Sequence, residues 1–463
     1  MQKLFDEVNS LDKRCYENFC LSEDILMEHA ADGMADFIRQ KFPKSAKVLI
    51  VCGSGNNGAD GIALARLLFG EYNVELFLVK ELRSPMAKLQ LQRAHALGVK
   101  ISIDLNECDV VVDAVFGTGF NGELDYEEKA VMQTLNKLNA YKIACDVPSG
   151  LKRGGECDDN IFKADISLTM GALKKAMFSD EAKEYVGAIE VINLGVTREV
   201  YEGETQWSLL DLEDLQLPFR NLQDTHKGSY GHLALLLGDK PGAAVLSAEA
   251  ALRFGAGLVT VVGERSSLVP RTIMNETTLP HNTTAVALGM GLGRAFTDEN
   301  IEAILCKGVP LIGDADLFRM NILADVLSVE NLVLTPHPKE FVSLLEATAL
   351  ADVSVSRLQK ERFKYVTLFC KAYPNVTLLL KGANVIIGRG EEFFINPHGT
   401  SALAKGGSGD VLSGLIGALL AQGYTPLNAA IHGSLAHTKL VQNYKGADFS
   451  LTPEDLIAGI GNL

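Results

Sequence analysis

Residues 47–60 read KVLIVCGSGNNGAD, an apolar β-branched run followed at once by glycine, asparagine and aspartate. Such a run is typical of a buried strand, and the six residues from Gly53 to Gly58 match G-x-G-x-x-G, where glycines open a tight turn at the start of a helix. Similar runs recur, for example at 110–116 and 142–146, with helix-period segments between them. Strands that alternate with helices predict an α/β fold, doubly wound around a mainly parallel sheet.

The alternation lapses once along the chain. Residues 196–231 are polar and turn-rich and contain the only Trp, and a second series of apolar runs begins at His232. We therefore expect two α/β domains, 1–208 and 209–463, each long enough to bury its own core. In the second domain we expect a single helix over 355–372.

Composition and charge argue against several classes of partner. The 463 residues include 43 Lys and Arg against 58 Asp and Glu, a net charge of −15, with no basic cluster, so no nucleic-acid partner is expected. The apolar stretch at 411–421 is shorter than the ~20 residues of a membrane span, and the N-terminus lacks the apolar core of a signal peptide. None of the eight cysteines forms a C-x-x-C pair. We expect a cytoplasmic protein without a membrane partner.

The loop after the first strand carries more than glycine. Asn56, Asn57 and Asp60 add amide and carboxylate oxygens, which suit a cation beside the polar atoms of a ligand. Two alternatives stay open for this loop alone. It could be the ordinary fingerprint of a nicotinamide-dependent dehydrogenase, or a capped turn that binds nothing.

Two further strand ends in the first domain carry an acid and glycines. Asp113 ends a valine-rich run before Gly117-Thr118-Gly119, and Asp146 precedes a Pro-Ser-Gly turn. In a parallel sheet the carboxyl ends of strands meet at one edge, so these loops predict one binding crevice. A buried Asp113 would also need a cation or a hydrogen-bond partner.

The combination of GSGNNGADG (53–61), DAVFGTGF (113–120) and DVPSGL (146–151) resembles the NAD(P)H-hydrate epimerase family over about residues 1–208. The resemblance implies a Rossmann-like α/β/α domain in which two loops hold the hydrated nicotinamide nucleotide. It also implies that Asp146 contacts the substrate and performs acid–base catalysis. The implied substrate-binding residues are Asn56, Asn57, Gly58, Ala59, Asp60, Gly117, Thr118, Gly119, Phe120, Asn121, Gly122, Glu123 and Asp146.

The same resemblance implies a potassium site. Its ligands would be Asn57, Asp113 and Ser149. The chain departs from the family at Ala59, where glycine is usual, and this extra methyl group would approach the bound phosphate.

A second chemical motif lies near the C-terminus. Residues 405–414 read KGGSGDVLSG and precede an apolar helical segment. Three glycines within Gly406–Gly409 allow successive backbone N–H groups to converge at a helix N-terminus, an anion hole for a phosphoryl group in flight. Asp410 then lies in the first turn, within reach of a substrate hydroxyl. The alternative is that Asp410 only caps the helix.

This G-G-S-G-D pattern resembles the ribokinase-like superfamily, whose aspartate deprotonates the accepting hydroxyl. HKGSYGHL (226–233), LTPHPKEF (334–341) and LLLKGANVII (378–387) narrow the resemblance to ADP/ATP-dependent NAD(P)H-hydrate dehydratases, over residues 209–463. Asp410 would be the catalytic base. His337, which alone would more often be structural, joins Ala243, Gly291 and Asp410 as implied substrate contacts. The implied nucleotide-binding residues are Lys381, Gly382, Ala383, Asn384, Val385 and Gly409.

The whole chain thus resembles the bifunctional NAD(P)H-hydrate repair family. The resemblance implies that the first domain interconverts the R and S hydrates. The second would phosphorylate the C6 hydroxyl of the S form with ADP and magnesium, and AMP and phosphate would be released. Nothing in the loops distinguishes ADP from ATP. The alternative is a small-molecule kinase of the ribokinase-like superfamily with a non-catalytic, nucleotide-binding first domain. We also expect a homo-oligomer.

Overall fold

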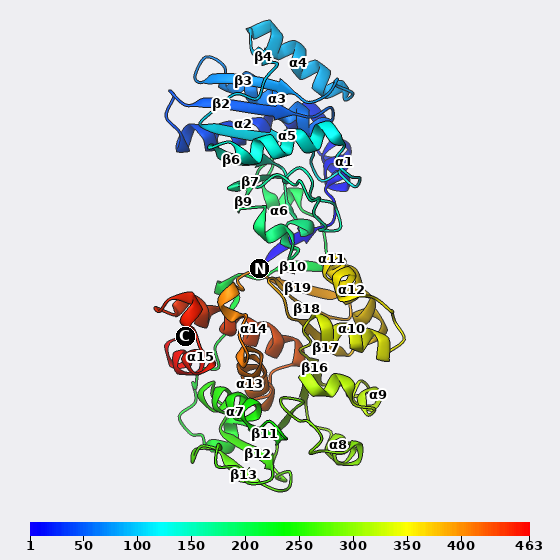
Figure 1. The fold of residues 1–463 in the computed structure, drawn as a ribbon, viewed down its shortest axis with the longest axis vertical. Coiled ribbons are helices and arrows are strands. Elements are labelled where there is room, and N and C mark those ends of the chain that lie inside the picture. The colour runs from blue at the N-terminus through cyan, green and yellow to red at the C-terminus, as the bar shows by residue number, and fades with distance from the viewer. The chain divides into compact units, whose positions relative to one another are not determined.

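The computed structural model describes residues 1–463, which form two compact units, residues 2–207 and 208–463 (Figure 1). In each unit, helices cover a mainly parallel sheet. The predicted α/β fold class is therefore confirmed. No helix in the structure combines the length and the apolar character needed to cross a membrane.

The first unit is built on a seven-stranded sheet in the order β4-β3-β2-β5-β6-β7-β9, in which every pair is parallel. The sheet strands are β2 (Lys47–Cys52), β3 (Asn73–Leu78), β4 (Lys100–Ser102), β5 (Val110–Ala114), β6 (Tyr141–Cys145), β7 (Ile166–Met170) and β9 (Ala188–Ile192). The helices are α1 (Asn9–Asn18), α2 (Glu23–Lys41), α3 (Asn56–Leu68), α4 (Pro85–Leu97), α5 (Tyr126–Lys137) and α6 (Arg198–Tyr201). Short strands β1 (Gln2–Phe5), β8 (Leu173–Lys174) and β10 (Trp207–Leu209) complete the strands up to Leu209.

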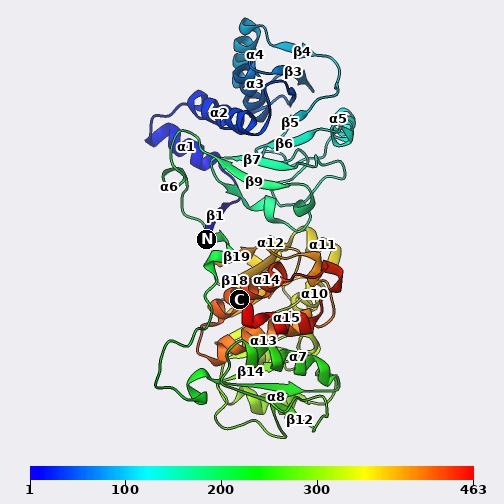
Figure 2. The same ribbon diagram turned by 90° about the vertical axis from the view of Figure 1, so that its left-hand side faces the viewer.

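Strand β2 shows why this sheet is apolar on both faces. Because side chains alternate along a strand, Val48 and Ile50 point to one face and Leu49 and Val51 to the other. The first pair packs in a core with α2, α3 and α4, and the second in a core with α5. Figure 2 shows α2, α3 and α4 on one side of the sheet and α5 on the other. Loops, rather than helices, lie at the carboxyl edge of the sheet.

The second unit contains strands in the order β13-β12-β11-β14-β15-β16-β17-β18-β19, parallel up to β17 and antiparallel from there. The strands are β11 (His232–Leu237), β12 (Leu258–Gly263), β13 (Met274–Glu276), β14 (Ala285–Leu288), β15 (Leu311–Gly313), β16 (Leu332–Leu334), β17 (Val376–Leu380), β18 (Val385–Arg389) and β19 (Glu392–Asn396). The helices are α7 (Pro241–Arg253), α8 (Asp298–Leu305), α9 (Leu323–Val326), α10 (Pro338–Ala347), α11 (Val355–Lys360), α12 (Arg362–Ala372), α13 (Ser408–Ala421), α14 (Pro426–Asn443) and α15 (Pro453–Gly459).

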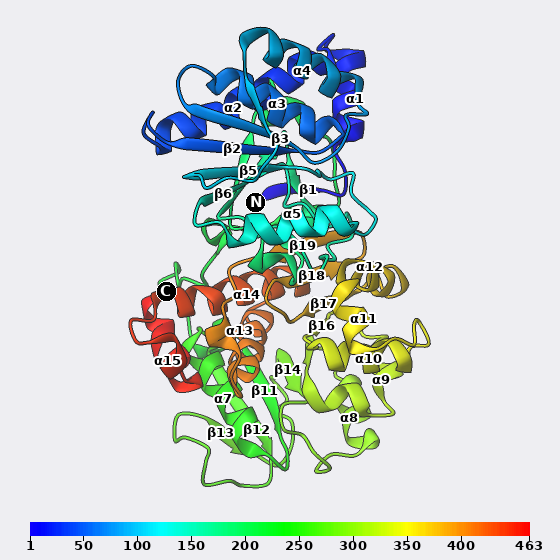
Figure 3. The same cartoon turned by 45° about the horizontal axis from the view of Figure 1, so that its top comes forward.

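Helices α7, α13, α14 and α15 share one hydrophobic core on one face of this sheet. Figure 3 shows them on the opposite side from α8, α10 and α12. Helix α13 is apolar around its whole circumference because it lies between α7, α14 and the sheet. Its N-terminus is thereby fixed at the carboxyl edge of the strands.

The single helix expected over 355–372 is wrong. The structure breaks it at Glu361 into α11 and α12. The break turns Arg362 inward, where this buried guanidinium donates to the carbonyl groups of Leu380, Lys381 and Asn384 (3.1–3.2 Å). These long-range hydrogen bonds outweigh the helical periodicity of the segment.

Candidate active sites

A cavity of about 680 Å³ lies at the carboxyl edge of the first sheet. The loops after β2, β5 and β6 bring Asn56, Asn57, Asp60 and Asp146 to it, together with all seven residues from Gly117 to Glu123. Among the lining residues that sequence reasoning missed are Asp12, Lys80 and Tyr201, which come from distant parts of the chain and belong to no motif.

Two of the predicted contacts do not line this cavity. Gly58 and Ala59 are buried, and the Ala59 side chain is fully enclosed in the core beside α2 and α3. The extra methyl group therefore points away from the cavity. A Cβ at position 58 would lie 2.1 Å from the carbonyl oxygen of Gly53, so glycine is needed there for the close approach of α3 to the turn.

Asp146 is the most constrained acid in the cavity. Its φ of 70° lies in the left-handed region, which residues other than glycine seldom adopt. Lys174, only 1% exposed, donates from Nζ to Asp146 Oδ1 at 2.6 Å. Backbone N–H groups of Met170 and Thr118 donate to the same carboxylate. Burial alone would raise the pKa of Asp146, but the Lys174 ammonium and these hydrogen bonds outweigh it and hold the pKa below its usual value.

Unlike Asp146, Asp60 has no cationic or hydrogen-bonding partner for its carboxyl group. Its carboxyl group faces the cavity and makes no hydrogen bond or ion pair in the structure. Burial, together with the nearby carboxylates of Asp146 and Asp12, raises its pKa well above the usual value. A carboxyl group with a raised pKa and one with a lowered pKa therefore share one cavity, the arrangement used for paired acid and base catalysis.

Of the three predicted potassium ligands, Asn57 lines this cavity, whereas Asp113 and Ser149 are buried and do not. Ser149 donates its hydroxyl and its backbone N–H to the two oxygens of Asp113 (2.7 and 2.8 Å), and neither residue is exposed. No cationic side chain pairs with Asp113, and burial raises its pKa to about 6. In the next loop, Nδ2 of Asn57 is buried without a partner. The Asp113 carboxylate and the Ser149 hydroxyl are oxygen ligands of the kind that suit a hard monovalent cation. The orphaned Asn57 atom is an amide nitrogen, which donates hydrogen bonds and cannot coordinate a cation, so only Oδ1 of Asn57 could serve as a third ligand.

The second site is built at the start of α13. Gly407 is the N-cap residue, and Asp410 lies in the first turn. The carboxylate of Asp410 caps no backbone N–H and makes no hydrogen bond or ion pair, so the alternative of a simple cap is wrong. Burial, and to a lesser degree the Asp314 carboxylate, raises the pKa of Asp410 to about 6. Asp410 is thus a free carboxylate held at a glycine-rich helix N-terminus.

An ion pair that sequence reasoning missed organises the floor of this site. Lys381 Nζ donates to Asp314 Oδ1 at 2.8 Å, and Ser413 Oγ donates to Asp314 Oδ2 at 3.0 Å. A Cβ added to Gly409 would lie 3.5 Å from Lys381 Nζ, which places this ammonium beside the predicted phosphoryl site. Asp314 follows β15, and its position at a strand end next to an apolar run is the only signal the sequence offered.

The predicted nucleotide-binding residues form the turn between β17 and β18. Gly382 and Ala383 are exposed, whereas the side chains of Asn384 and Val385 are buried. The carbonyl groups of this turn are held by Arg362, so the turn is positioned by a residue outside the motif.

His337 has a structural role in addition to its predicted contact. It caps α10, with Nδ1 accepting from the backbone N–H groups of Lys339 and Glu340 (3.1 and 3.2 Å). Nε2 lies 3.1 Å from Glu340 Oε1. Burial raises the pKa of Glu340, and Lys381 partly offsets this, so His337 and Glu340 lie near the Lys381–Asp314 pair.

The remaining predicted contacts are Ala243, in the first turn of α7, and Gly291, on the loop after β14, and the two segments are hydrogen-bonded to each other. The backbone N–H of Lys240 donates to the carbonyl oxygen of Gly291 at 3.0 Å. Gly291 has a φ of 62°, and a Cβ there would lie 2.4 Å from the carbonyl oxygen of Lys240 and 3.2 Å from Cβ of Ala243. Only glycine permits this contact.

Each unit thus places a catalytic-type carboxylate at the carboxyl edge of a parallel sheet, and the second adds a glycine-rich helix start. These features define a two-domain α/β enzyme suited to acid–base and phosphoryl-transfer chemistry. The family model described as "YjeF-related protein N-terminus" matches residues 23–176, and that described as "NAD(P)H-hydrate dehydratase" matches residues 233–460.

Full-length relatives agree with both matches. The bifunctional NAD(P)H-hydrate repair enzyme of Helicobacter pylori is 43% identical over 474 residues, covering 100% of both chains. The enzyme of the same name from Coxiella burnetii is 32% identical and covers 90% of each chain. A solved ADP/ATP-dependent NAD(P)H-hydrate dehydratase from Bacillus subtilis is 25% identical, with a TM-score of 0.45 over 54% of this chain and 94% of that one. The chain belongs to the family of bifunctional NAD(P)H-hydrate repair enzymes.

Proposed function

We propose that this enzyme repairs NADH and NADPH that have taken up water at the C5=C6 bond of the nicotinamide ring. Residues 2–207 interconvert the R and S hydrates, and residues 208–463 dehydrate the S hydrate with ADP. The observation that carries the proposal is the unpartnered Asp410 carboxylate at the start of α13, beside the Lys381–Asp314 pair. The full-length relationship to repair enzymes supports both halves.

In the second unit the chemistry begins with Asp410. Its carboxylate takes the proton of the C6 hydroxyl, which attacks the terminal phosphorus of ADP, supplied as its magnesium complex. Backbone N–H groups of Gly406–Gly409 and the Lys381 ammonium stabilise the charge on the transferred group. AMP leaves, and departure of phosphate with the C6–O electrons and loss of a C5 proton restore the double bond. Phosphorylation is needed because hydroxide is a poor leaving group.

In the first unit, Asp60 acts as the general acid of epimerisation and Asp146 as the general base. Asp60, protonated, gives a proton to the departing C6 hydroxyl, and the ring nitrogen stabilises the planar cation that results. Asp146, ionised, takes a proton from the water that adds to the opposite face, so no net proton is consumed. A potassium ion held by Asn57, Asp113 and Ser149 would supply positive charge beside the cavity when bound.

The decisive experiment is an assay of the whole chain with separated R and S hydrates of NADH and NADPH. With magnesium and ADP, the S hydrate should regain the absorbance of the reduced nicotinamide, and the R hydrate should follow through epimerisation. A stable phosphorylated product without this recovery would instead show a small-molecule kinase. The same assay with ATP in place of ADP decides the phosphoryl donor.

The pH dependence of dehydration is a specific prediction. Because the pKa of Asp410 is raised to about 6, the base is protonated and inactive at lower pH. We expect kcat/KM for the S hydrate to fall about tenfold per pH unit below 6 and to level off above it. The thermal unfolding transition measured in the same buffers is the control, since the second unit must stay folded over the pH range in which Asp410 titrates. A flat dehydration profile between pH 5 and 7 would contradict Asp410 as the base.

A second prediction concerns Arg362. Replacing it with methionine removes hydrogen bonds to the turn between β17 and β18, and the KM for ADP should rise about tenfold or more. The KM for the S hydrate should change less, because that substrate is bound by other loops. An equal loss for both substrates, or a loss of epimerisation, would indicate general damage instead.

Two expectations stay predictions. A reducing compartment such as the cytoplasm suits the eight free thiols. The mass of the protein in solution would test the expected homo-oligomer.

A further inference from the structure

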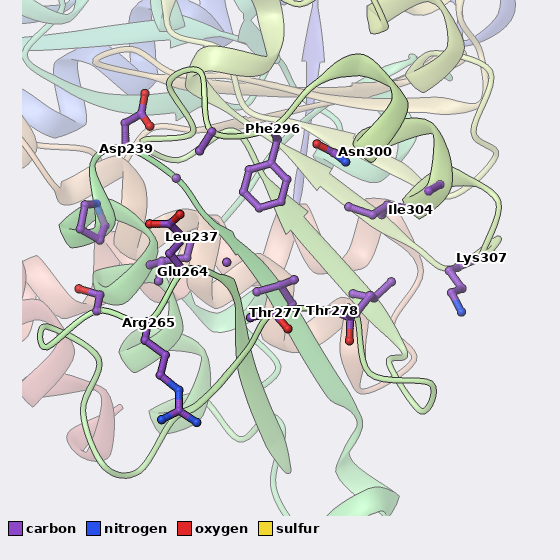
Figure 4. A pocket seen from close by; sticks show the side chains of 18 residues that line it. Leu237, Asp239, Glu264, Arg265, Thr277, Thr278, Phe296, Asn300, Ile304 and Lys307 are labelled. Carbon is purple, nitrogen blue, oxygen red and sulfur yellow. The ribbon is translucent and has the colours of Figure 1, made fainter.

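A larger cavity of about 930 Å³ lies within the second unit and has no part in the mechanism above. It is formed at the carboxyl ends of four neighbouring parallel strands, β13, β12, β11 and β14, and is closed on one side by α8 (Figure 4). None of the predicted site residues lines it. A cavity of this size at a strand-end edge is large enough for a nucleotide-sized ligand.

The cavity adjoins the proposed substrate contacts. Its lining includes Gly238, Asp239 and Pro241, which lead directly into Ala243 at the start of α7. Asp239 is in turn joined to the Gly291 loop, because its Oδ2 accepts from the backbone N–H of Arg294 at 2.7 Å. The loops that would hold the nicotinamide are therefore one wall of this cavity.

The distance along the sheet also fits a single substrate. Asp314, next to the reaction centre, follows β15, whereas Glu264 and Arg265 in the cavity follow β12, and three strand steps separate these two strands, about 14 Å in all. An extended nicotinamide adenine dinucleotide spans such a distance between its two bases. The proposed ADP site lies in the other direction, at the turn between β17 and β18.

The lining has the chemistry of a nucleoside site. The Phe296 ring projects into the open space (Figure 4), and no other aromatic ring packs against it. Glu264 and Arg265 follow β12, the second strand of a βαβ unit, and neither forms an ion pair. In dinucleotide-binding βαβ units, an acid at this strand end accepts from the ribose hydroxyls and an arginine accommodates a 2′-phosphate.

We propose that this cavity binds the adenylate half of the hydrated dinucleotide during dehydration. Phe296 stacks on the adenine, Glu264 accepts from the ribose, and Arg265 at the rim pairs with the 2′-phosphate of the NADPH form. The inference rests on the proposed dehydratase function and deepens it, because it assigns a subsite for the part of the substrate that does not react.

The test is steady-state dehydration by the whole chain with magnesium and ADP and three S hydrates, those of NADPH, NADH and reduced nicotinamide mononucleotide. Phe296→Ala should raise the KM for both dinucleotide hydrates about tenfold, because a base–aromatic stack is lost. It should leave kcat, the KM for ADP and the KM for the mononucleotide hydrate unchanged. Phe219→Ala, at a side chain that is 74% exposed outside the cavity, is the matched control.

Arg265→Met supplies an independent readout at an exposed side chain, where folding is not at risk. The KM should rise about tenfold for the NADPH hydrate and stay unchanged for the NADH hydrate. The proposal is overturned if Phe296→Ala raises the KM for the mononucleotide hydrate as much as the KM for the dinucleotide hydrates, or if it raises the KM for ADP instead. It is also overturned if neither variant changes any KM. Failure of the unaltered chain to dehydrate any of the three hydrates would overturn the proposed function itself.

Discussion

Asp410→Asn is expected to lower the rate of S-hydrate dehydration by about a thousandfold, in the middle of the range for loss of a general base. The replacement keeps the size of the side chain, and because the Asp410 carboxylate has no hydrogen bond or ion pair in the structure, the fold loses no side-chain interaction. The loss should therefore appear in kcat, while the KM for ADP changes little.

Two comparisons separate this effect from damage to the fold. Epimerisation by the same variant should proceed at the unaltered rate, because the Asp146 cavity lies wholly within residues 2–207. The thermal unfolding transitions should shift by no more than a few degrees. Retention of more than a tenth of the dehydration rate would mean that Asp410 is not the base.

The sequence predicts the strand-end loops well because the constraint on them is local. An apolar run followed by an acid and glycine has few structural solutions, so the α/β periodicity predicts Asp60 and Asp146 at strand-end loops, whereas the glycine-rich turn before an apolar helix predicts Asp410. The core strand β2 is the clearest case, because the apolar run that opens the stretch 47–60 and ends before Gly53 coincides with the observed strand, Lys47–Cys52.

The partners of these acids could not be predicted because they depend on long-range contacts. Lys174 reaches Asp146 from a two-residue strand, and Asp314 reaches Lys381 across 67 positions of the chain. Arg362 lies inside a segment whose periodicity favours a continuous helix, and only its buried hydrogen bonds explain the break. None of these residues belongs to a glycine-rich motif, so the local sequence pattern does not predict their roles.

The Lys174–Asp146 pair leads to the second large effect, Lys174→Met. Removing one member of a buried ion pair leaves an uncompensated charge, which costs about 3–5 kcal/mol of folding free energy. The pKa of Asp146 should rise at the same time, because the ammonium that opposes the effect of burial is gone. We therefore expect both a lower unfolding temperature for the first unit and loss of epimerisation. Dehydration of the S hydrate should remain.

The double variant Lys174→Met/Asp146→Asn distinguishes these two consequences. With neither charge present, the penalty for an unpaired buried carboxylate disappears, and much of the lost stability should return. Epimerisation should not return, because the base is missing. If the single variant unfolds like the unaltered protein and still interconverts the hydrates, the pair neither stabilises the unit nor maintains Asp146 as the ionised group. If the double variant is no more stable than the single one, the loss came from packing of the lysine stem rather than from charge.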